Sequence, residues 1–181
     1  MKTGKSHEQS VRTVLVRPAP GRGSRAILQL GTLRIPAAIG RSGRTSRKRE
    51  GDGATPIAAM ALLSGFLRGD RTGTPPTTLP LRRIGPSMLW CDAPDHPSYN
   101  RLVRAPFRPG HEEMHRADGL YDLCLVLDWN VTERRRHRGS AIFLHLIRPG
   151  YEPTAGCIAV SRRDMIRILP HLRRGTVVRV L

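Results

Sequence analysis

The chain of 181 residues is 39% hydrophobic, which suffices for one domain with a real core and argues against disorder throughout. Its formal net charge is +17, and 28 of its 31 basic residues are arginine. Such scattered arginines fit a codon preference or a carboxylate-rich substrate as well as nucleic acid. Because known nucleic-acid motifs are missing, we expect no nucleic-acid partner, and a basic nucleic-acid-binding domain stays the alternative from a different functional class. No apolar stretch approaches the roughly 20 residues of a membrane span.

Breaker residues and apolar runs predict the elements in chain order. Residues 1–10 are polar and are predicted to form a flexible N-terminus, followed by one domain over residues 11–181. The apolar segment 57–66 fits a short helix or a strand equally well. The Pro-rich and Gly-rich segment 69–86 is predicted to be a loop, and 90–100 to be irregular. Apolar runs bounded by turn residues predict strands at 11–16, 26–30, 33–39, 121–127, 141–146 and 176–180.

The clearest helix is predicted to begin at Ser161. Asp164 follows at the spacing of a capping acid, and Met165 and Ile168 give the segment one apolar stripe. Pro170 is expected to end or kink this helix. The elements together predict a mainly β domain with one helix near its C-terminus.

The three cysteines are Cys91, Cys124 and Cys157. Their odd number and wide spacing predict neither a disulfide framework nor a zinc site of the CxxC type. Cys124 lies in the apolar sequence LCLVL and is expected to be a small buried residue. The N-terminal sequence has charge but no apolar core of a signal peptide, so the chain as written is expected in the cytoplasm.

Residues 111–115, HEEMH, match the H-E-x-x-H pattern, which binds zinc when both histidines lie on one helix face. Pro109 and Gly119 leave few residues between breakers, which is short for such a helix. No second signature supplies the third ligand, for which Glu133 and Glu152 are no more than candidates. We therefore expect no metal site and no cofactor.

A second constellation is more specific. His145 ends a predicted strand, and Cys157 follows Thr-Ala-Gly on a predicted tight turn. Gly156 lets the backbone turn tightly and leaves the thiol and nearby N–H groups exposed. Taken singly, each residue would be read as a core residue. Together, a thiol and a nearby base are what nucleophilic acyl chemistry requires.

The sequences IFLHL (142–146) and TAGCIAV (154–160) resemble the L,D-transpeptidase catalytic domain family of the YkuD type. The signature of that family is a His, a spacer, then Ser/Thr-His-Gly-Cys and an apolar residue. Further similarity lies in EGDGATPIA (50–58), WCD (90–92), YN (99–100) and YDLCLVLDWN (121–130). The resemblance implies a mainly β, sandwich-like fold of mixed β-sheets with a helix after the catalytic cysteine.

The resemblance also implies an activity on peptidoglycan stem peptides. Cys157 would attack the carbonyl of the third residue, a diamino acid with an L-centre, and expel the terminal D-alanine through a thioester. His145 would take the thiol proton and return it to the leaving amine. A carbonyl near Leu146 would orient the imidazole, and N–H groups at Gly156 and Cys157 would stabilise the oxyanion. Arg162 is an alternative to Arg148 as a carboxylate clamp. The predicted substrate-binding residues are Thr154, Arg148, Trp90, Tyr99 and Asn100.

The chain departs from the family pattern in ways that bear on the acceptor. Ala155 stands where the family usually has a second His, Ala159 where many members have Arg or Asn, and Leu146 and Ala58 where Gly is common. The acyl group could pass from the enzyme to an amine, giving a 3→3 cross-link, or to water, giving hydrolysis. Without an export signal we expect a cytoplasmic L,D-carboxypeptidase acting on muropeptides as the alternative, or a cell-envelope enzyme if export is unconventional or the start site differs. We expect a monomer.

Overall fold

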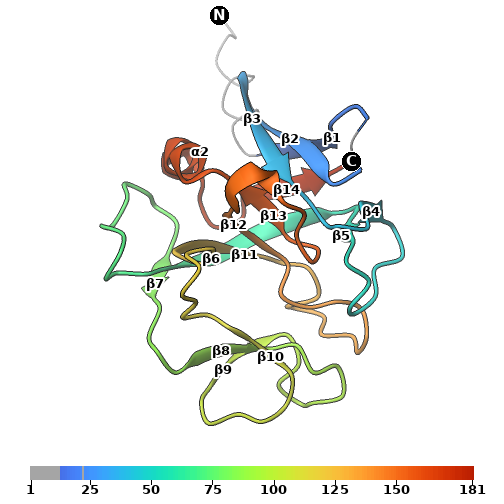
Figure 1. Ribbon diagram of the computed structural model, residues 1–181, viewed down its shortest axis with the longest axis vertical. Helices are drawn as coiled ribbons and strands as arrows, with labels where there is room; N and C mark the ends of the chain where they lie inside the picture. Colours follow the sequence, from blue (N-terminus) through green and yellow to red (C-terminus); the bar gives the residue numbers. More distant parts are fainter. Residues whose placement is uncertain (1–12, 22) are drawn as a thin grey trace, which may run out of the picture.

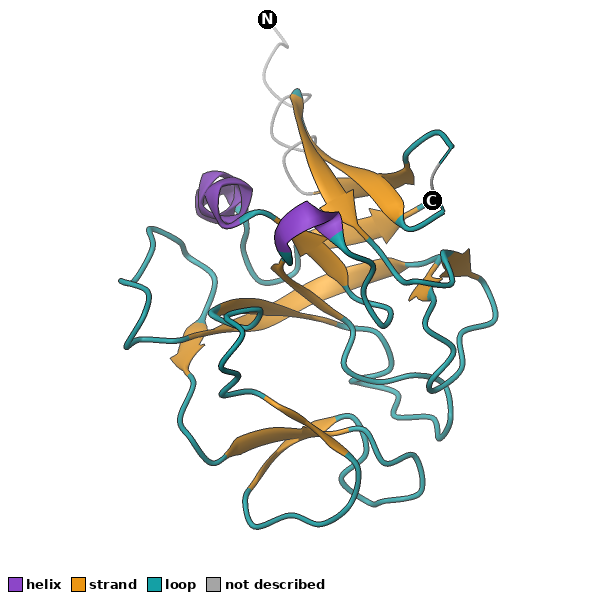
Figure 2. Cartoon of the chain, in the orientation of Figure 1, coloured by secondary structure: helices purple, strands orange, loops and turns teal. Residues whose placement is uncertain are grey.

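The computed structural model describes residues 13–21 and 23–181, and the predicted flexible segment 1–10 lies outside them. Strands account for 38% of the described residues and helices for 8%. The prediction of a mainly β domain with a small helix late in the chain is therefore confirmed. Figure 2 shows this balance directly, with strands and long connecting loops making up most of the molecule.

The strands are β1 Thr13–Pro18, β2 Arg25–Leu30, β3 Leu33–Ala38, β4 Arg44–Thr45, β5 Thr55–Pro56, β6 Ala59–Leu67, β7 Leu81–Arg83, β8 Met88–Cys91, β9 Arg101–Arg104, β10 His111–Glu113, β11 Leu123–Leu127, β12 Phe143–Leu146, β13 Ile158–Val160 and β14 Val177–Val180. The helical segments are η1 Pro149–Tyr151, α2 Arg162–Ile168 and η2 Leu169–His171.

One large sheet closes on itself and forms most of the fold. Its nine strands follow the order β11-β12-β13-β3-β2-β1-β14-β6-β7, and β6 also pairs with β11. The β6–β11 pairing closes the sheet, so the strands from β11 round to β6 form a ring without a free edge, and β7 pairs with β6 outside that ring. In place of two separate sheets packed face to face, this single sheet encloses an aliphatic core, in which Leu28, Leu62, Leu125 and Ile158 are fully buried.

A second sheet of three strands, in the order β10-β8-β9, lies apart from the large sheet in Figure 1. An aromatic cluster joins the two. Trp90 from β8 packs edge-on against Phe143 of β12 at 5.2 Å between ring centroids, and Tyr121 packs against Phe143 at 5.8 Å. Edge-to-face pairs of this kind contribute roughly 0.5–1.5 kcal/mol each beyond the area that they bury. The small sheet is thereby held over the part of the large sheet that carries β12 and β13.

The predicted helix forms as α2, and its N-terminus is capped by Ser161. The Asp164 N–H donates to Ser161 Oγ at 3.0 Å, and Ser161 Oγ donates to the Asp164 carboxylate at 2.7 Å. Met165 and Ile168 are fully buried against the core. Pro170 lies in η2, directly after the α-helix, as expected for a residue that cannot continue one.

Several local predictions need correction. The segment 57–66, which the sequence left open between helix and strand, belongs from Ala59 onward to strand β6, whose first residues alternate between accessible and buried positions. Trp90 and Cys91, predicted to be irregular, are buried in strand β8. The strand predicted over 141–146 begins at Phe143, because Ala141 has a φ of +51° and turns the chain before β12.

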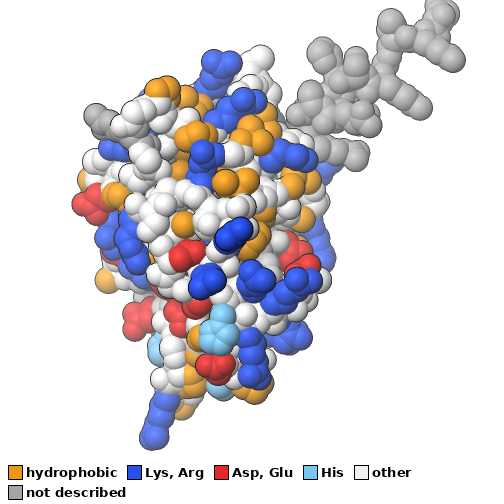
Figure 3. Space-filling view, turned by 90° about the vertical axis from the view of Figure 1, so that its right-hand side faces the viewer, with side chains coloured by type: hydrophobic (Ala, Val, Ile, Leu, Met, Phe, Trp, Pro, Cys, Tyr) orange, Lys and Arg blue, Asp and Glu red, His pale blue; other side chains and the backbone are white. Residues whose placement is uncertain are grey.

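The surface carries charge of both signs. Figure 3 shows Lys and Arg side chains spread over one face of the molecule, with Asp and Glu between them. The arginine cluster at 134–138 is exposed in the loop between β11 and β12. None of the helices in the described part of the chain is long and apolar enough to cross a bilayer.

Candidate active site

Cys157 lies on a turn directly before β13. Its Sγ donates a hydrogen bond to the Ala141 carbonyl at 3.1 Å and accepts one from the Phe143 N–H at 3.4 Å. Gly156 precedes it with a φ of +141°, and a Cβ placed there would lie 2.9 Å from the Ala54 carbonyl oxygen. Only glycine fits this position, so the turn that presents the sulfur depends on Gly156.

His145 comes from the neighbouring strand β12, which runs parallel to β13 with His145 opposite Ala159. Residues two apart on a strand share a face, so the imidazole and the sulfur lie on the same face, diagonally related across the strand pair. The Leu146 carbonyl, which we predicted to orient the ring, contacts Nδ1 at 2.7 Å. A carbonyl only accepts, so Nδ1 carries the proton and Nε2 keeps the lone pair that a base needs.

Burial sets the protonation of both groups. The Cys157 and His145 residues are 8% and 6% exposed. Burial raises the pKa of the Cys157 thiol to about 12, and the hydrogen bond from Phe143 offsets only part of that effect. Burial also lowers the pKa of His145 to about 4, against the opposing effect of the Leu146 hydrogen bond. At neutral pH the pair therefore consists of a neutral thiol and a neutral imidazole.

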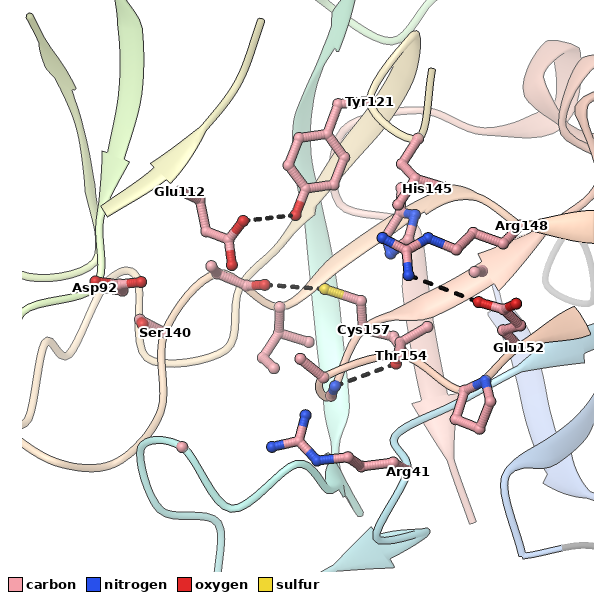
Figure 4. Close-up of a pocket in the computed structure, with 18 of the residues that line it drawn as sticks. Arg41, Asp92, Glu112, Tyr121, Ser140, His145, Arg148, Glu152, Thr154 and Cys157 are labelled. Carbon is pink, nitrogen blue, oxygen red and sulfur yellow. Dashed lines mark hydrogen bonds and ion pairs between the residues drawn. The ribbon is translucent and has the colours of Figure 1, made fainter. Parts of the chain in front are cut away.

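Both residues open into one cavity of about 460 Å³. Figure 4 shows its polar walls, with Asp92 and Glu112 on one side, Arg148 and Glu152 on another, and Arg41 on a third. Burial raises the pKa of both Asp92 and Glu112. The cavity thus presents carboxylates from β10 and the end of β8 opposite guanidinium groups from the loops of the large sheet.

Tyr121 lies between Glu112 on the acidic side of the cavity and His145. Its ring packs edge-on against the His145 ring at 5.3 Å, and its hydroxyl donates to Glu112 at 3.4 Å. Burial raises the pKa of the Tyr121 phenol, so the group is a neutral donor at working pH. Sequence reasoning did not single out Tyr121 or Glu112 for the site. Tyr121 lies two residues before the buried strand β11, and Glu112 lies in the HEEMH sequence, which forms no group of metal ligands within the described residues. Neither position indicates from the sequence that the two side chains share a cavity.

Thr154, predicted to bind substrate, lines the cavity and also holds the turn of the nucleophile. Its Oγ1 donates to the Cys157 carbonyl at 2.7 Å and accepts from the Gly156 N–H at 3.1 Å. The Gly156 N–H is therefore engaged and does not point free toward an oxyanion, contrary to the prediction. The hydrogen bonds among the described residues leave the Cys157 N–H available for that role.

Trp90, Tyr99 and Asn100, also predicted to bind substrate, are not among the residues that line the cavity. They are 5%, 3% and 0% exposed and pack behind it. Asn100 Oδ1 accepts hydrogen bonds from Trp90 Nε1 and from the Ala141 N–H, each at 3.0 Å. Because the Ala141 carbonyl accepts the hydrogen bond from the Cys157 thiol, the buried Asn100 amide positions the sulfur rather than a ligand. Tyr99 donates to Glu50, which does line the cavity.

The two arginines proposed as carboxylate clamps differ in position. Arg148 lines the cavity, half exposed, with Glu152 at 3.6 Å and Asp118 at 3.6 Å as partners. Arg162, the first residue of α2, instead pairs with the buried carboxylate of Asp122, which lies directly before β11, and it does not line the cavity. The structure therefore leaves Arg148 as the clamp candidate at the site.

The H-E-x-x-H sequence forms no helix. His111–Glu113 is strand β10, where alternate side chains point to opposite faces, so its two histidines cannot share a helical face. Across residues 13–21 and 23–181 there is no group of three His, Cys, Asp or Glu side chains arranged to hold a metal ion. The motif instead contributes Glu112 to the cavity wall.

A family model for the L,D-transpeptidase catalytic domain (YkuD) matches residues 22–180. The chain belongs to the L,D-transpeptidase catalytic domain family. Among solved structures, L,D-transpeptidase 1 of Mycobacterium tuberculosis is similar at 11% identity and a TM-score of 0.43, over 94% of this chain and 60% of that one. No curated protein matches the chain. This L,D-transpeptidase-family domain thus spans less than two thirds of the solved chain that it resembles.

Proposed function

We propose that this domain is a cysteine acyltransferase that acts on the tetrapeptide stems of peptidoglycan. The observation that carries the proposal is the shared cavity of Cys157 and His145, in which the Nδ1 atom of His145 is fixed by the Leu146 carbonyl and Nε2 is left as a base. Membership of the L,D-transpeptidase family supports the substrate class. The neutral resting pair supports general-base activation of the thiol during attack.

The reaction proceeds in two halves. Cys157 Sγ attacks the carbonyl carbon of the third stem residue while its proton passes to His145 Nε2. The tetrahedral intermediate collapses, the C–N bond to the terminal D-alanine breaks, and His145 gives the proton to the leaving amine. The product is a thioester on Cys157. An amine or water then attacks this thioester, with His145 again taking a proton, and the free thiol is regenerated.

The charges of the cavity fit a substrate with both an ammonium and a carboxylate group. Some diamino acids carry a second α-amino-acid centre at the end of the side chain, and that centre has both an ammonium group and a carboxylate. Asp92 and Glu112 offer carboxylates to the ammonium group, and Arg148 offers a guanidinium to the carboxylate. Charge-assisted contacts of this kind would hold the third stem residue with its carbonyl over the sulfur.

The acceptor distinguishes transpeptidation from L,D-carboxypeptidase activity. Ala155 lines the cavity at the position where the family usually has a second His. An alanine there offers no hydrogen bond to an incoming amine, which favours water as the acceptor. We therefore propose net hydrolysis as the second candidate, with 3→3 cross-linking as the outcome that would exclude it.

The proposal is tested by incubating the purified protein with a disaccharide tetrapeptide and resolving the products by mass spectrometry. Tripeptide product supports hydrolysis, whereas a dimer that carries a 3→3 bond supports transfer. A carbapenem should add covalently, with the mass shift confined to the peptide that contains Cys157. A matched Cys157→Ala variant should give neither product nor adduct. Turnover that survives in this variant would refute the assignment of the nucleophile.

A further inference from the structure

Lys48 is the only lysine in the described part of a chain whose other basic residues there are arginines. Its side chain is 3% exposed and lines the cavity of Cys157. The Nζ atom donates to the Asp52 carboxylate and, at 3.1 Å, to the Arg49 carbonyl. An ammonium group has three donors, so these two partners leave one N–H uncommitted. Such a buried cation beside a nucleophile calls for an explanation.

Two glycines form the slot that admits this lysine. A Cβ on Gly139, which has a φ of +89°, would lie 2.9 Å from Lys48 Cε, and a Cβ on Gly156 would lie 3.5 Å from Nζ. The unbranched stem of lysine fits a slot of this width, whereas the planar fork of arginine would not. The slot therefore ends with the ammonium group beside Gly156, the residue directly before the nucleophile.

The oxyanion of the tetrahedral intermediate needs donors beside the nucleophile, and the backbone provides fewer than the family resemblance implied. The Gly156 N–H is taken by Thr154 Oγ1 at 3.1 Å. The Cys157 N–H remains for the oxyanion among the described residues. A hole of this type normally combines at least two donors. The geometry at Gly156 leaves the free N–H of Lys48 Nζ as the nearest charged donor.

We propose that Lys48 is a catalytic residue whose Nζ donates to the oxyanion of the tetrahedral intermediate together with the Cys157 N–H. The role rests on the proposed acyl transfer. The ion pair with Asp52 fixes the ammonium group in place before the substrate arrives, which is the preorganisation that electrostatic catalysis needs. The charge also acts on the thiol, because Lys48 opposes the rise that burial causes in the pKa of Cys157.

The test compares Lys48→Met with Lys48→Met/Asp52→Asn and with the wild type. Methionine keeps an unbranched stem but removes the charge and the donors. The double variant also removes the negative charge of Asp52, a partly exposed carboxylate that keeps its bonds from the Arg49 and Ala54 N–H groups when the lysine is lost, so it separates loss of the ion pair from loss of the donor. The readouts are kcat and KM for release of D-alanine from a tetrapeptide stem, together with thermal unfolding of each protein.

We expect Lys48→Met to lower kcat by roughly 10²–10³-fold, the usual cost of losing one oxyanion donor, while KM changes less than about threefold. The double variant should keep kcat equally low, and the thermal unfolding of both variants establishes that each is folded. A folded single variant with kcat near that of the wild type, or a double variant that recovers kcat, would overturn the role. Absence of turnover in the wild type would instead overturn the proposed function itself, and the two failures are thus distinguished.

Discussion

Acidification should destabilise this fold through one buried imidazole. Burial lowers the pKa of His145 to about 4, from an ordinary value of 6.5. The folded protein therefore holds His145 neutral at pH values where the unfolded chain has already bound a proton. In that interval the unfolded state binds more protons, so the free energy of unfolding falls as the pH falls.

The magnitude follows from the shift. One pKa unit corresponds to about 1.4 kcal/mol, so a fall from 6.5 to about 4 is worth about 3 kcal/mol. This contribution is complete above pH 6.5 and is lost as the pH falls from 6.5 to about 4. A loss of this size is a large part of the roughly 5–15 kcal/mol that stabilises a typical domain.

Urea unfolding of the wild type and of His145→Gln at pH 7.5, 6, 5 and 4 isolates the effect. Glutamine does not titrate and can still donate to the Leu146 carbonyl, so the carboxylates that titrate in this range cancel in the difference between the two proteins. We expect that difference to change by about 3 kcal/mol between pH 7.5 and pH 4, in the direction that favours the variant at low pH. A difference that stays constant across the range would refute the assignment of a buried neutral His145.

Three further predictions follow from the site. Cys157→Ala should abolish turnover while its thermal unfolding stays within a few degrees of that of the wild type, since only a sulfur is lost; circular dichroism melts beside the activity assay check both parts. Alkylation of Cys157 by iodoacetamide in the free protein should be slow at pH 7 and rise steadily with pH, because its pKa is raised to about 12; fast labelling at pH 7, located by peptide mass, would contradict this. Asn100→Ala should lower the free energy of unfolding, measured in urea, by roughly 3 kcal/mol. The change leaves the Trp90 Nε1–H and the Ala141 N–H without an acceptor and places alanine at a φ of +57°. A loss below about 1 kcal/mol would show that the network is dispensable.

The sequence alone was enough to single out Cys157 and His145 as the candidate pair, because the signal is local. A strand that ends in His145 and a turn that contains Gly156 and Cys157 are short patterns whose chemistry and spacing can be read without knowing the fold. The helix at Ser161 was also predictable, since an N-cap and an apolar stripe act within two turns of chain. These parts of the fold were fixed by neighbouring residues.

The closure of the sheet and the walls of the cavity depend on contacts between distant residues. The β6–β11 pairing brings residues 62–67 against 123–127, and no local pattern specifies that partner. Glu112 reaches the cavity only because β10 pairs with β8 and the small sheet packs on the large one. Asn100 was misplaced for the opposite reason: a polar residue in a loop suggests ligand contact, but its amide is fully buried among backbone partners. Long-range packing therefore determines which residues line the cavity, whereas local sequence determines the turn that carries Cys157.

Burial of the catalytic pair has a consequence for selectivity. With the pKa of Cys157 at about 12 and that of His145 at about 4, transfer of the thiol proton to the imidazole is strongly unfavourable in the empty cavity. In the mechanism we propose, the transfer becomes favourable only when the negative charge moves from sulfur to a substrate oxygen that meets the Cys157 N–H and Lys48. A small oxidant or alkylating agent offers no such oxygen, so it meets an unreactive thiol. The proposed substrate, a stem peptide that places its carbonyl between these donors, would supply the missing stabilisation, and reactivity would thereby be tied to correct binding.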